Sequence, residues 1–256
     1  MQKKHLPSLN ARYWTAMLVA SLVGTTSGDF MSNDLHMGFA KGLGPLAALF
    51  AATLFLEQRS SGSTETYYWT AVVIARTAAT NLADLATHQF RIDYWWVGAC
   101  LMVMFLAVLL ISRGHAASQL FSPGYALAKT DLRYWSIMAI ASTFGTNGGD
   151  LISDGLGLGF GLASLLCAVA LAVVLSAWRF TSCRNEIGYW ITVLTIRTSG
   201  TVMGDFLSSR EGCNLGFSGA ALITGLLLGG LIVCWPDGDP ARSLLSKTER
   251  GSETIS

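Results

Sequence analysis

The sequence has 256 residues and a formal net charge of +1; 52% of the residues are hydrophobic and only 13% are charged. Soluble domains carry about 25% charged residues, so this chain lacks the side chains that would cover a water-facing surface, and its apolar content excludes intrinsic disorder. The balanced charge, without any stripe of Lys and Arg, excludes a nucleic-acid-binding protein. We therefore expect an all-α integral membrane protein with the lipid bilayer as its main partner.

Eight apolar stretches follow one another along the chain. Each is long enough to cross the roughly 30 Å core of a bilayer as a helix of about 20 residues. They comprise residues 13–30, 39–56, 68–86, 94–111, 134–152, 158–178, 189–207 and 217–235. An even number of crossings places both termini on the same side of the membrane.

The distribution of Lys and Arg predicts which side that is. Twelve of these residues fall in the termini and in the connections after even-numbered spans, whereas the connections after odd-numbered spans contain only Lys41, Arg91 and Arg210. Positive charge accumulates on the cytoplasmic side of membrane proteins, so we expect both termini in the cytoplasm. The remaining two, Arg76 and Arg197, fall inside spans.

The chain repeats itself four times. Each copy begins with a Tyr-Trp pair, and an Asp follows fifteen residues after the Trp: the pairs are Trp14 and Asp29, Trp69 and Asp84, Trp135 and Asp150, and Trp190 and Asp205. This spacing predicts four two-helix repeats (12–59, 67–113, 133–179 and 188–235) that all point the same way, related by an axis along the membrane normal. Residues 112–131 form the predicted cytoplasmic linker between the halves, and residues 236–256 a cytoplasmic tail.

These residues resemble a family of bacterial membrane proteins that is defined by a tandem repeat of unknown function. The similarity lies in the Trp that opens each copy and the Gly-Asp pair that closes its first helix, and it covers nearly all of the chain from about Arg12 to Trp235. The second copy departs from the pattern, with Ala83-Asp84 in place of Gly-Asp. The resemblance implies a multi-pass protein of the bacterial inner membrane and carries no activity.

Polar and small residues follow helical spacing in the first helix of every repeat. Residues four apart share one face of a helix, and these faces read Ser21-Thr25-Asp29, Arg76-Thr80-Asp84, Ser142-Thr146-Asp150 and Arg197-Thr201-Asp205. Beside them run small pairs that allow close helix packing: Gly24/Gly28, Ala79/Ala83, Gly145/Gly149 and Gly200/Gly204. We expect the odd helices to form an inner bundle whose polar faces meet at the axis, and the more apolar even helices to form an outer ring.

The four Asp, the four Thr and the two Arg residues are the candidate transport pathway. Charges inside a span are costly and are usually functional, and carboxylate and hydroxyl oxygens suit hard cations. Two structural interpretations stay open for these charges. The Asp residues could simply end the first helix of each repeat, and Arg76 and Arg197 could reach toward the cytoplasmic face or pair between helices. For Trp14, Trp69, Trp135 and Trp190, we expect anchoring at the membrane interface.

The leading functional hypothesis is a transporter or channel for a small cation. Its transport could be coupled to protons, because clustered carboxylates also exchange protons. One alternative is an anion or zwitterion carrier that uses Arg76 and Arg197; another is a membrane scaffold or sensor. An enzyme is not expected, since HExxH, GxSxG and Walker motifs are missing. We expect neither a cofactor nor a metal site, because the five Cys form no CxxC pair and His36 and His88 occupy different repeat positions. Charged residues in the short outer connections, among them Asp154 and His88, should be solvated.

Overall fold

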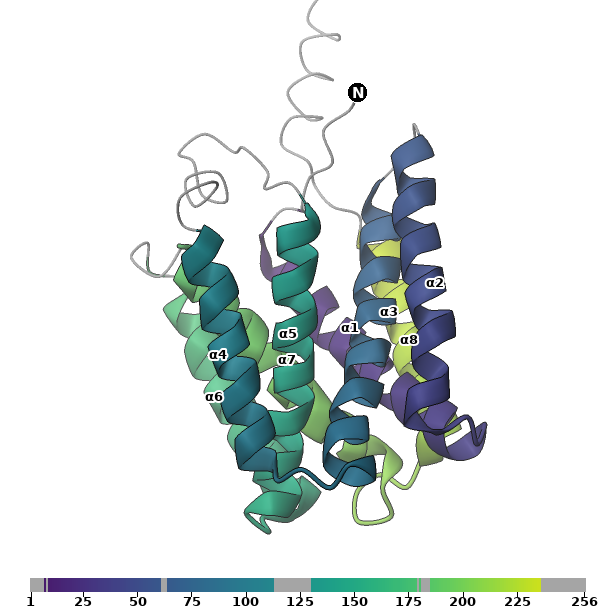
Figure 1. The fold of residues 1–256 in the computed structure, drawn as a ribbon, viewed down its shortest axis with the longest axis vertical. Coiled ribbons are helices and arrows are strands. Elements are labelled where there is room, and N and C mark those ends of the chain that lie inside the picture. Colours follow the sequence, from purple (N-terminus) through teal and green to yellow (C-terminus); the bar gives the residue numbers. More distant parts are fainter. Residues whose placement is uncertain are drawn as a thin grey trace, which may run out of the picture.

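The computed structural model describes residues 7, 9–60, 64–112, 130–178, 180 and 185–235, and within these ranges all regular secondary structure is helical (Figure 1). The eight α-helices are α1 (Ala11–Asp29), α2 (Gly38–Arg59), α3 (Thr64–Asp84), α4 (Tyr94–Ser112), α5 (Leu132–Asp150), α6 (Gly159–Ala177), α7 (Glu186–Ser208) and α8 (Gly216–Cys234). They coincide with the eight predicted stretches to within a few residues at most ends. The predicted linker and tail lie largely or wholly outside the described residues.

Local sequence fixes where three of the four odd helices begin. Asn10, Asp131 and Asn185 precede α1, α5 and α7, and the side-chain oxygen of each accepts a hydrogen bond from the backbone N–H three residues later, at 2.8–3.0 Å. Such N-caps satisfy one of the backbone donors that the first turn of a helix leaves without a partner.

The odd helices of the first three repeats end in the same way. Directly after the repeated Asp, the chain continues as a π-helical turn: η1 (Phe30–Asp34), η2 (Leu85–Gln89) and η3 (Leu151–Gly155). A residue in the left-handed region then reverses the chain toward the even helix: His36, Arg91 and Gly157. In the fourth repeat this residue is Asn214, and α7 runs past Asp205 to Ser208 without a π turn.

The odd helices form the predicted inner bundle. Helices α1, α3, α5 and α7 pack in a closed ring in which each contacts two neighbours. The even helices lie outside this ring, and each packs mainly along the odd helix of the next repeat: α2 along α3, α4 along α5, α6 along α7 and α8 along α1. Figure 1 shows the first two of these pairs. The two helices of one repeat therefore do not form an isolated hairpin, because α2, α4, α6 and α8 each link their own repeat to the following one.

Small residues allow the inner helices to approach closely. A Cβ atom added at Gly28 would lie 2.9 Å from the Cβ of Thr80, and one added at Gly149 would lie 2.7 Å from the Cβ of Thr201. Gly204 faces Thr25 in the same way across the last contact of the ring. The small pair of one repeat thus packs against the polar face of the next, and that packing holds these polar faces at the axis.

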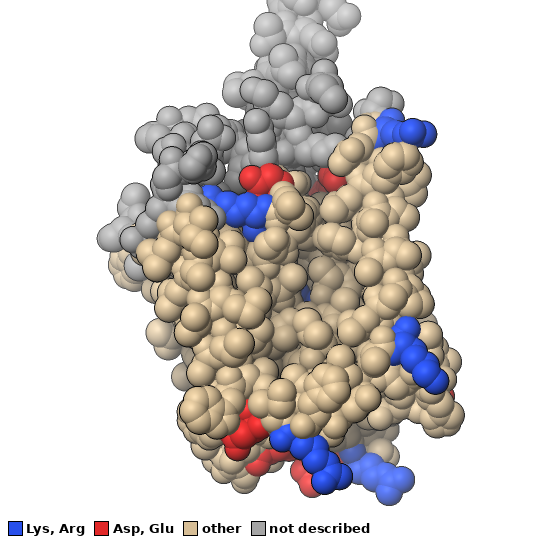
Figure 2. Space-filling model, viewed as in Figure 1, with Lys and Arg blue, Asp and Glu red and all other residues tan. Residues whose placement is uncertain are grey.

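The even helices have the composition of membrane spans. Among the described helices, four are long and apolar enough to cross a membrane: residues 38–59, 94–111, 159–177 and 216–234. Their large apolar side chains are mostly exposed on the outside of the bundle, as Val103, Leu165 and Leu226 illustrate. Figure 2 shows the same division, since most charged side chains on this face lie toward its two ends and the surface between is largely uncharged.

Candidate functional site

Four tyrosine hydroxyls close one end of the axis. Tyr13, Tyr68, Tyr134 and Tyr189 precede the repeated Trp residues, and all four are buried. Their hydroxyl groups form a continuous ring of hydrogen bonds, with O–O distances of 2.9 Å from Tyr13 to Tyr68, 2.7 Å from Tyr68 to Tyr134, 3.0 Å from Tyr134 to Tyr189 and 2.7 Å from Tyr189 back to Tyr13. Because a hydroxyl both donates and accepts, four of them can satisfy one another. We call this the tyrosine end.

The neighbouring Trp residues support this ring rather than facing outward. Interface anchoring predicts indole rings exposed on the outer surface, but Trp14, Trp69, Trp135 and Trp190 are at most 5% exposed. Each indole packs edge-on against the Tyr that precedes it, with ring centroids 4.9–5.3 Å apart. The structure thus differs from the expectation because the Tyr-Trp pair contributes both of its rings to the core of the inner bundle.

Arg76 crosses the middle of the bundle. Its guanidinium is fully buried and donates to the other three inner helices: to Thr25 Oγ1 on α1 at 2.9 Å, to Thr146 Oγ1 on α5 at 2.5 Å and to Thr201 Oγ1 on α7 at 2.5 Å. The side chain also donates to Ser21 Oγ and to the carbonyl oxygens of Ser142 and Arg197. Three of the four repeated Thr residues therefore bind this one cation, and Thr80 Oγ1 has no hydrogen-bond partner among the described residues.

Arg197 occupies the equivalent position of the fourth repeat but extends the opposite way. Arg76 donates to Thr146 on α5, whereas Arg197 donates to Met138, about two helical turns closer to Tyr134 on the same helix. Arg197 is fully buried; its Nη2 donates to Met138 Sδ at 3.2 Å, and its Nε and Nη1 have no partner within the described parts of the chain. The two arginines therefore differ in direction and partners, so the axis keeps neither four-fold nor two-fold symmetry at this depth.

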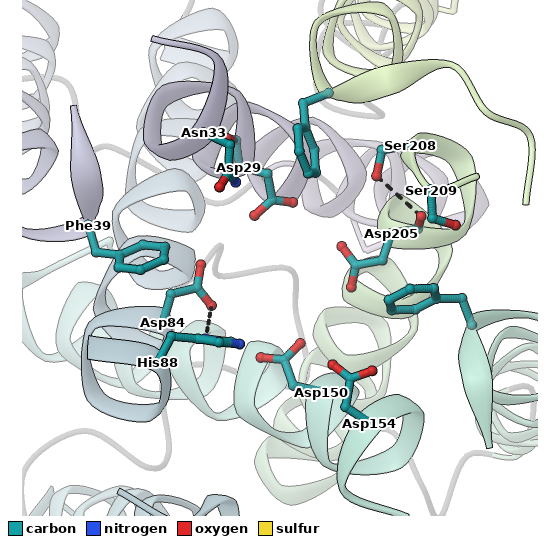
Figure 3. A pocket seen from close by; sticks show the side chains of 12 residues that line it. Asp29, Asn33, Phe39, Asp84, His88, Asp150, Asp154, Asp205, Ser208 and Ser209 are labelled. Carbon is teal, nitrogen blue, oxygen red and sulfur yellow. Dashed lines mark hydrogen bonds and ion pairs between the residues drawn. The ribbon is translucent and has the colours of Figure 1, made fainter. Parts of the chain in front are cut away.

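The four repeated Asp residues surround a cavity at the other end, the aspartate end. Asp29, Asp84, Asp150 and Asp205 point toward one another from the four inner helices (Figure 3). The cavity has a volume of about 300 Å³. Because Asn33 and His88 line it and are exposed, it opens at this end of the bundle. Asp84 and Asp150 are 7% and 8% exposed, and the Oδ2 atoms of Asp29 and Asp150 have no hydrogen-bond partner in the described structure.

These carboxylates do not serve as helix caps. Asp29, Asp84 and Asp150 each precede a π turn and make no side-chain hydrogen bond to it. Asp84 Oδ1 lies 3.8 Å from His88 Nδ1 on the same helical segment. As the helix-end interpretation expects, α1, α3 and α5 end at these Asp residues, but the carboxylates line the cavity and do not bond to the turn that follows.

Sequence reasoning missed several residues of this cavity. Its wall contains three phenyl rings, Phe39, Phe160 and Phe217, which stand in the first turns of α2, α6 and α8. The sequence does contain a pattern that could have identified these rings, because a Gly-Phe pair opens three of the four even helices. His88 and Asp154 are exposed, as expected, and they also line the mouth of the cavity. Burial raises the pKa of Asp154, and Glu211 adds to this effect while His88 opposes it.

The polar lining of the cavity consists mainly of carboxyl groups. Ionised carboxylates only accept hydrogen bonds, so four of them facing one space need donors or cations from elsewhere. Among the described residues, no three His, Cys, Asp or Glu lie close enough to hold a metal ion together. At roughly 30 Å³ per water molecule, the cavity has room for a hydrated ion or a small organic molecule.

Comparison with known proteins identifies a repeat family. The family model described as Repeat of Unknown Function (DUF347) matches residues 12–63, 133–183 and 188–236, which together make up more than half of the chain. The match includes the first, third and fourth repeats; the second repeat, in which Ala79 and Ala83 replace both glycines, lies outside it. No curated protein and no solved structure matches the sequence.

Proposed function

Because the chain belongs to the Repeat of Unknown Function family, whose description names no activity, we propose its function from the site itself: a membrane carrier for a cation, which binds at the aspartate end. The observation that carries this proposal is the set of four carboxylates that face one open cavity, two of them with an unpartnered oxygen. Protons bind to the same oxygens, so the site offers a means of coupling cation movement to protons.

The membrane setting of this proposal is a bundle of eight spans in the bacterial inner membrane, with both termini in the cytoplasm. The four even helices are apolar enough to face lipid. The four odd helices are of similar length and run alongside them inside the ring, so a bilayer spanned by one set would be spanned by the other. The excess of Lys and Arg beside the termini favours the aspartate end as the outer end.

The middle of the axis favours a carrier over an open channel. Arg76 binds three inner helices at the level of the repeated Thr residues, and the tyrosine ring closes the axis beyond it. A cation that enters from the aspartate end would meet a buried positive charge and then four mutually bonded hydroxyls. Passage therefore requires a second conformation in which these contacts rearrange.

An anion or zwitterion carrier has less support. Arg grips carboxylates and phosphates through free N–H groups, but Nε, Nη1 and Nη2 of Arg76 all donate to protein oxygens. The unpartnered nitrogens of Arg197 are fully buried. An anion would also have to pass the four Asp residues, which repel it.

Uptake into liposomes tests the proposal. Purified protein should be reconstituted and screened with monovalent cations, divalent cations and protons, using the wild type, Asp29→Asn and Asp150→Asn. Asp34→Asn is the matched control, because Asp34 is exposed in η1 and does not line the cavity. We expect uptake of at least one cation that both cavity variants lose and the control keeps. No uptake of any cation by the wild type, or unchanged uptake by both cavity variants, would contradict the proposal.

A further inference from the structure

We propose that the cavity at the aspartate end binds an organic cation with an alkylated ammonium group, held between carboxylates and phenyl rings. This inference rests on the proposed cation site and names the class of its ligand. Two independent observations carry it: aromatic rings in the cavity wall, and buried carboxylate oxygens without a partner. The choline headgroup and tetramethylammonium are the simplest members of this class.

The repeat architecture places the rings beside the carboxylates. Phe39 begins α2, which packs along α3, and Figure 3 shows its ring next to Asp84 at the edge of the cavity. Phe160 begins α6, which packs along α7, the helix of Asp205, and Phe217 begins α8, which packs along α1, the helix of Asp29. Three of the four repeats thus provide an aromatic ring for the Asp of the next repeat.

The second repeat departs from this pattern in a way that preserves aromatic character. Its counterpart to the Gly-Phe pair is Asp93-Tyr94. The ring centroid of Tyr94 lies 6.4 Å from that of His88, and that of His88 lies 6.1 Å from that of Phe39. Tyr94 does not line the cavity itself, but its ring lies beside that of His88, which does.

Aromatic faces favour a cation that has shed part of its water. A cation within about 6 Å of a ring centroid is attracted by the negative face of the ring, and quaternary ammonium groups are recognised in this way. Small metal ions keep their water in preference to a phenyl contact and need several oxygen ligands at once. The described carboxylates do not converge closely enough to provide these ligands.

The size and the charge of the cavity agree with this ligand class. Its volume of about 300 Å³ is at the lower limit of ordinary small-molecule pockets, which are apolar with a few polar groups. Asp150 is more than nine-tenths buried, lines the cavity and has an Oδ2 atom with no partner in the described chain. An alkylated ammonium group would neutralise this carboxylate and place its methyl groups against the rings.

The test measures binding to the purified protein in nanodiscs by calorimetry at constant ionic strength. The probes are choline, sodium, potassium and 3,3-dimethylbutan-1-ol, a neutral molecule with the shape of choline. The variants are Phe160→Leu and Phe217→Leu, with Phe160→Tyr to keep a ring at the same position. Phe55→Leu on the exposed face of α2 is the control outside the cavity.

We expect choline to bind more tightly than either metal ion and the neutral molecule not to bind. Each Phe→Leu change should weaken choline binding about three- to tenfold, whereas Phe160→Tyr and Phe55→Leu should leave it unchanged. If the metal ions bind through the Asp residues and choline binds no better, or if both Leu variants retain full affinity, the inference fails while the proposed cation site stands. If no cation of either kind binds, both fail.

Discussion

The two ends of the axis are built from the same four helices and have opposite properties. At the tyrosine end, each hydroxyl is both donor and acceptor. The four groups therefore satisfy one another's hydrogen bonds and close this end of the axis. At the aspartate end, four carboxyl groups, which only accept hydrogen bonds when ionised, face one space and leave it open. A four-fold arrangement thus produces a closed ring of hydrogen bonds from Tyr and an open cavity from Asp, because the two side chains differ in what they can donate.

The largest effect should follow from separating the inner helices on which both ends depend. A Cβ atom at Gly145 would lie 2.8 Å from the backbone carbon of Arg197. Gly145→Leu should therefore lower the thermal midpoint in detergent by about 5–10 °C or prevent folding. Gly229→Leu on the exposed side of α8, where a Cβ atom meets nothing within 4 Å, should melt like the wild type. Equal midpoints for the two variants would show that the inner helices do not pack in this way.

The orientation of the two ends can be tested by thiol labelling. Cys213 follows α7 near the aspartate end and Cys234 ends α8 at the opposite end, and both are exposed. In single-cysteine proteins in intact cells, a membrane-impermeant reagent should label Cys213 almost completely and Cys234 only after the cells are broken open. The reverse result would place the aspartate end in the cytoplasm.

A smaller effect should follow from opening the tyrosine ring. Tyr134→Phe removes a hydroxyl that bonds to both Tyr68 and Tyr189. At about 1 kcal/mol per hydrogen bond, the thermal midpoint should fall by a few degrees, with little change in cation binding at the far end. Tyr67→Phe, one residue before Tyr68, is the control. A cation affinity that falls together with the midpoint would show that the two ends are coupled rather than separate.

Much of this arrangement could be predicted from the sequence. The fifteen-residue spacing from Trp to Asp fixes the repeats, and the polar and small faces fix which helices are inside; Gly28 does face Thr80 and Gly149 does face Thr201. These features depend on residues within one helix or on periodicity, which a sequence displays directly. The Asp residues were expected near one level of the axis for the same reason, and the structure brings them to one cavity.

The packing of the even helices, the directions of the two arginines and the place of the Phe rings depend on contacts that the repeat pattern does not specify. Each repeat has the same two helices whether α2 packs along α1 or along α3, so the packing of even helices on the next repeat could not be derived from the pattern. Arg76 and Arg197 have equivalent positions, and only the surrounding side chains decide that one donates to the Thr residues and the other to Met138. The Gly-Phe pairs were visible but resembled ordinary apolar helix starts, because their position beside the Asp of another repeat arises only in the assembled ring.

The most direct measurement of the central claim is cation binding to the aspartate end itself. Calorimetric titration in nanodiscs with sodium, potassium and tetramethylammonium should compare the wild type with the double variant Asp29→Asn/Asp150→Asn. Asn adds a donor and removes the charge, so the folded protein should persist while affinity falls at least tenfold, and acidification of the wild type should also weaken binding because protons compete for the carboxylates. Binding that is equally tight in the double variant would contradict the assignment of these carboxylates as the cation site.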